Sequence, residues 1–315
     1  MPLGEPPVVS TTVQVTSAID IPASPVVHSG RSWARAAKDI RDGVAARELW
    51  GHLGWQDIKQ RYRRSVIGPL WITMSMGVTA AGLGLLYSQL FGIAVNTFLP
   101  YLTVGFIVWG FILGCLTEGS DAFISNEGLI KHLPAPLTVY ALRTVWRQTL
   151  MMLHNMLVYA VVLALFFGSI AAGGYTLSPN GAPQPGLSWT MVLAIPAFVV
   201  LALNGAWVAL LFGIISTRYR DIPQVINALT QLLFYATPIV WPVDVLTQKL
   251  GPGDWKHLIV ELNPLYHFVQ ILRAPLIGSE QSWHHWVVVG VITVVGWSLA
   301  FLAMRNYRAR VSYWV

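Results

Sequence analysis

Three arginines within four residues, Arg61, Arg63 and Arg64, form the densest group of anion-binding side chains in this chain. A guanidinium group presents a planar fork of N–H donors that matches phosphate oxygens, so such a cluster favours phosphate-bearing partners. Directly after it, residues 65–117 contain no Asp, Glu, Lys or Arg. The arginines therefore stand where the chain enters an apolar medium, and the anions expected beside them are lipid headgroups.

Compact motifs of catalytic centres are missing from the sequence. It contains no GxxxxGK[ST] phosphate loop, no HExxH pair and no GxSxG turn. The single cysteine, Cys115, lies in an apolar stretch, which excludes an intrachain disulfide and a CxxC metal site. His284 and His285 adjoin two tryptophans, and we interpret them as headgroup contacts rather than metal ligands. We expect this chain to have no catalytic residue and to bind no metal or cofactor.

The apolar stretches are long enough to cross a membrane. Hydrophobic residues make up 55% of the 315 residues and charged residues 11%, whereas soluble domains carry about 25% charged residues. A helix needs about 20 apolar residues to cross a bilayer. The sequence predicts an all-α membrane protein with six transmembrane helices, at Ile67–Phe91, Leu99–Thr117, Thr149–Ile170, Met191–Thr217, Ile222–Trp241 and Trp286–Met304.

The basic residues indicate the orientation of these spans. Of the 20 Lys and Arg residues, only Lys249, Lys256 and Arg273 fall on one side. Because cytoplasmic loops carry the excess of Lys and Arg, both termini are predicted to be cytoplasmic. Contact with anionic lipid accounts for the net charge of +6, so we expect no nucleic acid partner. Residues 1–43 are predicted to be a basic, disordered cytoplasmic extension and residues 44–315 the membrane domain.

Two cytoplasmic segments have helical patterns of their own. Residues 45–63 gather apolar side chains on one stripe among charged ones, which is typical of an amphipathic helix lying on the membrane surface. Residues 127–133 predict a short helix that Asn126 caps and Pro134 stops. A short cytoplasmic helix between two spans suits a membrane subunit that receives force from a soluble motor, although a plain connector has the same pattern.

On the outer side, residues 258–278 are apolar enough to enter lipid but contain Glu261 and Arg273. A lipid-facing span would make these charges costly. We therefore expect re-entrant half-helices, broken at Asn263 and Pro264, because irregular backbone at that depth needs protein or a water-filled cavity around it.

Polar groups within or beside the spans allow two interpretations. Asn204, Asn227 and Gln231 could form interhelical hydrogen bonds, or they could line a polar passage. At the cytoplasmic side, Arg147 is expected to pair with Glu118 or Asp121, which would relieve both charges.

Several motifs, in this order, resemble those of ABC-2 type polysaccharide exporter permeases, the membrane subunits that export O-antigen, teichoic acid or capsule. The resemblance covers the chain from about Trp50 to its C-terminus. The long, basic, Pro-rich N-terminal extension departs from shorter members and favours an actinobacterial version, whose cargo would be a lipid-linked galactan. The matching runs are RYRRSVIGPLW (61–71), NEGLIK (126–131), RYRD (218–221), ATPI (236–239) and NPL (263–265).

The resemblance implies partners and cargo. Two such chains would form a homodimeric pore in the bacterial plasma (inner) membrane, and two copies of a separate ATPase, which holds ATP and Mg, would bind below. The cargo would be a polysaccharide on a polyprenyl pyrophosphate, gripped by Arg61, Arg63 and Arg64 unless these only anchor the chain to lipid. Aromatic side chains would line the duct unless they only pack against lipid: Phe106, Trp109, Tyr235 and Trp241. The ATPase would dock on Glu127, Gly128, Leu129, Ile130, Lys131 and His132.

Other functions remain open at this stage. A drug or small-molecule efflux permease of the same superfamily has the same architecture, although the arginine cluster favours an anionic, lipid-linked cargo. An intramembrane glycosyl or acyl transferase would need a convergent acid and base, and the sequence offers no convincing pair. A membrane scaffold without transport would not need the re-entrant outer segment.

Overall fold

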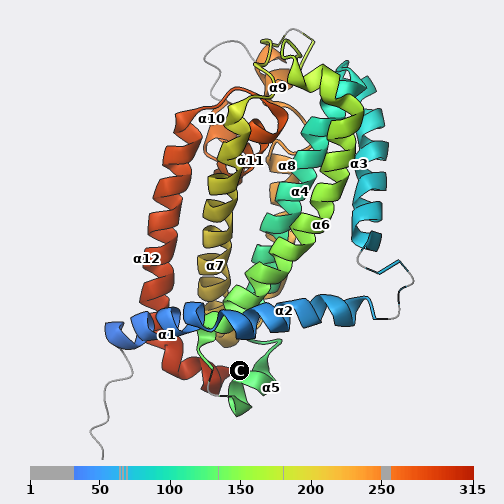
Figure 1. The fold of residues 1–315 in the computed structure, drawn as a ribbon. Helices are drawn as coiled ribbons and strands as arrows, with labels where there is room; N and C mark the ends of the chain where they lie inside the picture. The colour runs from blue at the N-terminus through green and yellow to red at the C-terminus, as the bar shows by residue number, and fades with distance from the viewer. Residues whose placement is uncertain are drawn as a thin grey trace, which may run out of the picture.

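The computed structural model describes residues 32–63, 65, 67–68, 70–133, 135–179, 181–249 and 257–315, which form helices without any strand among them. Long helices run side by side, while α1 (Trp33–Ala45) and α2 (Arg47–Arg61) lie across one end of the bundle (Figure 1). Five helical segments are long and apolar enough to cross a membrane: α3 (Leu70–Phe91), α4 (Val95–Ser120), α6 (Leu137–Ala171), η1 with α7 (Trp189–Leu193 and Ala194–Arg218) and α12 (Trp283–Trp314). The prediction of an all-α membrane protein is confirmed.

The fifth predicted span, Ile222–Trp241, differs in the structure. It is α8 (Ile222–Ala236), a helix of only 15 residues. Thr237 has an extended backbone and precedes Pro238, and the residue before a proline is disfavoured in the α conformation. The helix therefore ends earlier than the apolar pattern suggests, and α8 does not reach the usual spanning length.

Two spans extend well beyond their predicted bounds. Helix α6 has 35 residues, or about 52 Å at the usual rise, against about 30 Å for a hydrocarbon core. Helix α6 begins at Leu137, so much of the cytoplasmic loop predicted between the second and third spans forms the first turns of this helix. Helix α12 likewise continues to Trp314, beyond the predicted end at Met304. These extensions carry the arginines and polar groups that meet α1 and α2.

Helix α4 is the centre of the bundle and packs against α3, α6, α7, α8 and α11. Phe98, Leu102 and Val108 on this helix are completely buried. Gly119 allows close backbone contact with α7, because a Cβ added there would lie 3.1 Å from the Cα atom of Ala209. Burial of apolar side chains and close backbone contact therefore fix α4 against α7, as is common between membrane helices.

The expectation of disorder through residue 43 is wrong for the part that the structure describes. Helix α1 packs on α6 and α12. The buried Asp39 accepts hydrogen bonds from the backbone N–H groups of Leu137 and Thr138, both at 3.1 Å, and from Arg308 Nε at 2.5 Å. A carboxylate at the N-terminus of α6 satisfies free N–H groups and favours the helix dipole. Residues 1–31 lie outside the described residues.

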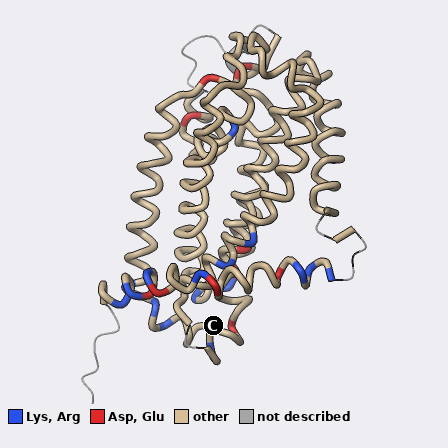
Figure 2. The backbone as a smooth tube through the Cα atoms, in the orientation of Figure 1, with Lys and Arg blue, Asp and Glu red and all other residues tan. Residues whose placement is uncertain are grey.

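Charge is concentrated at the end that carries α1 and α2. Most Lys and Arg residues lie there, together with α5 (Glu127–His132) and the C-terminus (Figure 2). The opposite end holds α9 (Val243–Lys249), α10 (His257–Glu261) and α11 (Pro264–Ile277) (Figure 1). The distribution of basic residues therefore has the asymmetry that the sequence predicted.

Candidate functional site

The short helix predicted after Asn126 is present as α5, and it projects from the charged end of the bundle (Figure 1). Leu129 and Ile130 hold it against the buried cluster that includes Phe123 and Met304. The other side of α5 is open: Gly128, Lys131 and His132 are exposed. Lys131 Nζ lies 2.5 Å from Glu127 Oε1 and lowers the pKa of that carboxyl. The helix is thus anchored on one face and accessible on the other.

Asn126 precedes α5 as predicted, but its side chain does not cap the helix. Its amide nitrogen donates to the carbonyl of Ala122 at 2.7 Å, and its Oδ1 accepts from Arg143 Nη1 at 2.7 Å. Asn126 therefore connects the start of α5 to α6 rather than satisfying the free N–H groups of α5.

The predicted ion pair at the base of the spans is formed, and Glu118 is the partner of Arg147. Arg147 Nη2 and Nε lie 2.6 and 2.9 Å from Glu118 Oε2. Gln148 Nε2 donates to the same oxygen at 2.6 Å, and Arg61 Nη2 lies 3.3 Å from Oε1. Glu118 on α4 thus collects donors from α2 and α6.

Asp57 on α2 extends this pair into a network that the sequence analysis did not predict. Its two oxygens lie 2.5 and 2.8 Å from Arg143 Nη2 and Nε, and Arg147 Nη1 donates to Oδ2 at 2.7 Å. Burial by itself would raise the pKa of Asp57, but the hydrogen bonds and charges of Arg143 and Arg147 outweigh it and hold the pKa below its ordinary value. A sequence signal existed: Arg143 and Arg147 share one helical face, and like charges at that spacing need an acid between them.

We call Asp57, Glu118, Arg143, Arg147 and Asn126 the junction. It joins α2, α4, α6 and the segment that leads into α5 by direct hydrogen bonds. Because the arginine and aspartate side chains are about 15% exposed, water screens these charges little. The junction is therefore a polar connection between α5 and the ends of α4 and α6 at the charged side of the molecule.

The arginine cluster after α2 is only partly described. Arg61 is engaged with Glu118, and its Nη1 lies 3.8 Å from the sulfur of Met151. Arg63 is exposed, and Arg64 lies outside the described residues. Ile58 on the predicted membrane-facing stripe of α2 is buried, and Trp50 packs edge-on against Trp146 of α6 at 5.9 Å. Part of the apolar stripe thus contacts protein.

Of the aromatic residues predicted to line a duct, Phe106 and Trp109 lie on α4, Tyr235 lies on α8 and Trp241 follows α8. A cavity of about 440 Å³ lies between these helices. Phe106 stacks on Phe234, with ring centroids 6.2 Å apart, and Trp241 Nε1 donates to the carbonyl of Tyr235 at 3.2 Å. Two polar residues of the fifth predicted span, Asn227 and Gln231, also line the cavity. The other lining residues are Trp109, Leu113, Thr117, Thr230, Phe234 and Tyr235.

Asn263 lies between α10 and α11, where the segment of residues 258–278 is interrupted. Its side chain accepts from the backbone N–H of Leu265 at 3.0 Å, with Pro264 as the first helical residue, so both residues start α11. Asn263 Nδ2 also donates to Thr237 Oγ1 at 2.9 Å, which ties this break to the end of α8. Arg273 is fully buried, bonds the carbonyl of Pro238 at 2.8 Å and lies over the Tyr101 ring at 4.1 Å. The two irregular segments therefore support each other.

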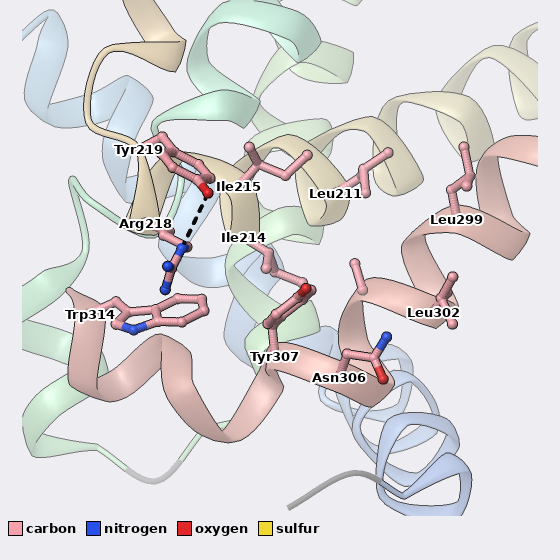
Figure 3. Close-up of a pocket in the computed structure, with 11 residues that line it drawn as sticks. Leu211, Ile214, Ile215, Arg218, Tyr219, Leu299, Leu302, Asn306, Tyr307 and Trp314 are labelled. Carbon is pink, nitrogen blue, oxygen red and sulfur yellow. Dashed lines mark hydrogen bonds between the residues drawn. The ribbon is translucent and has the colours of Figure 1, made fainter.

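A second cavity, of about 480 Å³, lies between α7 and α12 near their ends at the charged side of the molecule (Figure 3). Its walls are apolar, with Leu211, Leu299 and Leu302 on facing helices. At one end Arg218 lies over the Trp314 ring at 5.2 Å, with Nε 3.4 Å from the hydroxyl of Tyr219 (Figure 3). The RYRD turn thus holds the C-terminal end of α12 against α7.

Comparisons with known proteins agree with this architecture. The chain is 23% identical over 257 residues to the O-antigen export system permease protein RfbA of Klebsiella pneumoniae, which covers 80% of this chain and 90% of the relative. A protein of the same name from Myxococcus xanthus is 22% identical over 240 residues, 75% of this chain and 82% of the relative. The model of the family described as ABC-2 type transporter matches residues 48–277. That match covers well over half of the sequence, from α2 to the end of α11, and the chain therefore belongs to the ABC-2 type transporter family.

Proposed function

We propose that this chain is the membrane subunit of an exporter that moves a polyprenyl-pyrophosphate-linked polysaccharide out of the cytoplasm. A separate ATPase subunit, two copies for each pair of permease chains, supplies the energy. The relatives are named as O-antigen export permeases, which supports a glycan cargo. In this proposal α8 and the residues that follow it serve as the sixth crossing, and both termini face the cytoplasm.

The junction is the observation that carries the proposal. Helix α5 has one face free for a soluble partner, and Asn126 before it is bonded to Arg143 of α6. Arg143 shares Asp57 with Arg147, which in turn holds Glu118 of α4. A displacement of α5 would thus pass to two membrane helices through short, charged contacts. Rigid helices joined by specific hydrogen bonds carry coupling of this kind.

The face of α4 and α8 is the proposed path for the glycan. Tyr235 offers an exposed ring there, with the largely buried Trp109 in the cavity wall, and Asn227 and Gln231 offer amide groups. Sugar rings pack on aromatic faces by their C–H groups, so the chain slides without strong bonds that would trap it. Residues of α4 and α8 line this cavity, and a second copy of the chain that faced them would close it into a duct. This arrangement supports a homodimer.

The end of α2 is the proposed site for the pyrophosphate. Arg63 is exposed there, and Arg61 has a half-exposed guanidinium that Glu118 holds in place. Arg64 would add a third cation from outside the described residues. Bidentate, charge-assisted bonds to phosphate oxygens suit this set.

Co-purification with the ATPase encoded beside this chain tests the proposal. We expect a complex of two permease chains and two ATPase chains whose ATP hydrolysis increases when lipid-linked glycan is added in nanodiscs. A drug-like substrate should not replace the glycan. Nucleotide hydrolysis by the purified permease alone, or a complex indifferent to lipid-linked glycan, would contradict it.

A further inference from the structure

Four side chains with metal-ligand chemistry meet where α10, α11 and α12 come together. Glu261 is the last residue of α10, His267 lies in the first turns of α11, and His284 and His285 begin α12. The ligand atoms of Glu261, His267 and His284 all lie within 4.8 Å of one another. His284 Nε2 is 3.4 Å from Glu261 Oε2. Carboxylate and imidazole groups at this separation are the ligand types of a zinc site.

Hydrogen bonds fix which nitrogen of His267 is free to bind a metal. His267 Nε2 lies 2.8 Å from the main-chain carbonyl of Glu261. A carbonyl only accepts, so Nε2 carries the hydrogen and Nδ1 of the neutral ring holds a lone pair. Metal-binding histidines in proteins are oriented in the same way, by an N–H donated to a carbonyl or carboxylate.

His285 faces that lone pair. Its Nδ1 lies 2.8 Å from His267 Nδ1, so one hydrogen is shared between the two nitrogens. Two imidazole nitrogens bound to one zinc ion stand about 3.3 Å apart at the usual bond lengths, so the rings need to separate only slightly. On binding, His285 gives up the hydrogen on Nδ1 and takes one up on Nε2 through solvent, so that both neutral rings present an Nδ1 lone pair to the ion.

We propose that Glu261, His267 and His284 form a site for Zn²⁺ or a similar divalent transition metal, with the Glu261 carboxylate, His284 Nε2 and His267 Nδ1 as ligands. His285 Nδ1 lies beside His267 but outside this group of three, and it would move in as the fourth ligand. Three nitrogens and one oxygen suit a tetrahedral ion of intermediate softness, whereas Mg²⁺ and Ca²⁺ prefer oxygen ligands. This revises the interpretation of His284 and His285 as headgroup contacts, because sequence spacing alone does not bring Glu261 and His267 beside them.

The surroundings of the site favour binding. His267 is fully buried, so its ring is held rigidly, while the side chains of His284 and Glu261 are 60% and 44% exposed and leave a route for the ion. The ion would tie the broken outer segment, which carries Asn263 and Arg273, to the start of α12. The proposal concerns binding at this end of the molecule and does not depend on the cargo or on the ATPase.

Metal titration of the full-length protein tests the proposal. The chain is purified in detergent through an affinity tag without histidines, stripped with a chelator, and titrated with Zn²⁺ against a chromophoric competitor and with Co²⁺ by visible absorption. We expect one ion per chain, the intense absorption of tetrahedral Co²⁺, and a rise in melting temperature with Zn²⁺. His284→Ala and Glu261→Gln alter exposed side chains and should each lower Zn²⁺ affinity by more than about tenfold.

His52→Ala is the matched control, since His52 is an exposed histidine on α2 that bonds Gln56 at 2.7 Å, and it should leave affinity unchanged. His285→Ala should remove the tetrahedral Co²⁺ spectrum. The proposal is overturned if the stripped protein binds no stoichiometric ion, or if binding survives both exposed substitutions with unchanged affinity.

Discussion

Replacing Asp57 by Asn should weaken the docking of α2 on the bundle. Asp57 accepts three hydrogen bonds from Arg143 and Arg147, and its side chain is 16% exposed. Removing one partner of a buried ion pair costs about 3–5 kcal/mol. The cost is reduced here because Arg147 keeps Glu118, Arg143 keeps Asn126, and the Asn side chain retains one acceptor oxygen. We therefore expect a loss of about 2 kcal/mol, which corresponds to about a 30-fold change in an equilibrium constant.

Hydrogen exchange measures this loss directly. The amides of residues 50–61 are protected while α2 remains docked, so Asp57→Asn should speed their exchange by about 30-fold. Glu48→Gln makes the same change of charge on the same helix at an exposed position and serves as the control. Equal exchange rates in the two variants would refute the claim that the junction holds α2 in place.

Three further predictions test other parts of the account. Gly128→Trp should abolish co-purification of the ATPase, because Gly128 is exposed on the free face of α5, whereas Gly290→Trp, at another glycine with open space around it, should not. The pKa of Asp57 is held below its ordinary value, so its contribution to stability should be fully present above the ordinary Asp pKa of about 4 and be lost as pH falls through the lowered pKa. Hydrogen exchange of α2, measured from about pH 7 downward, should show this loss in wild type but not in Asp57→Asn. Arg273→Met should lower the free energy of unfolding by about 1–3 kcal/mol in detergent, because it removes the donor to the Ile239 carbonyl and one of the two donors to the Pro238 carbonyl, the other being the Tyr101 hydroxyl; unchanged thermal unfolding would show that these contacts are dispensable.

The features that the sequence predicted are local ones. Lengths of apolar runs located the five segments long enough to span, with ends in error by up to about three turns. Asn263 and Pro264 predicted the start of α11, because the cap and the first helical residue adjoin in sequence. Pro238, just after the last turn of α8, also indicates the early end of this helix, although the apolar run continues past it to Trp241.

The features that the sequence did not predict depend on residues far apart in the chain. Asp39 lies about 100 positions before the helix start that it caps, so the residues near it do not reveal this partner, although Ser32 marks the start of α1 as an N-cap. Asp57 and Arg143 are 86 positions apart. The histidines of α12 meet His267 only because α11 packs against α12. In each case the partner is set by helix packing, which periodicity does not specify.

Depletion of this chain in living cells tests the central claim most directly, that it is the passive permease of an ATP-driven glycan exporter. The measurement is the amount of lipid-linked glycan on each side of the plasma membrane, with wild-type and Gly128→Trp chains returned in parallel. The account predicts that full-length glycan accumulates on the cytoplasmic side and that only the wild-type chain restores export. Unchanged arrival of glycan outside the cell, or restoration by Gly128→Trp, would contradict it.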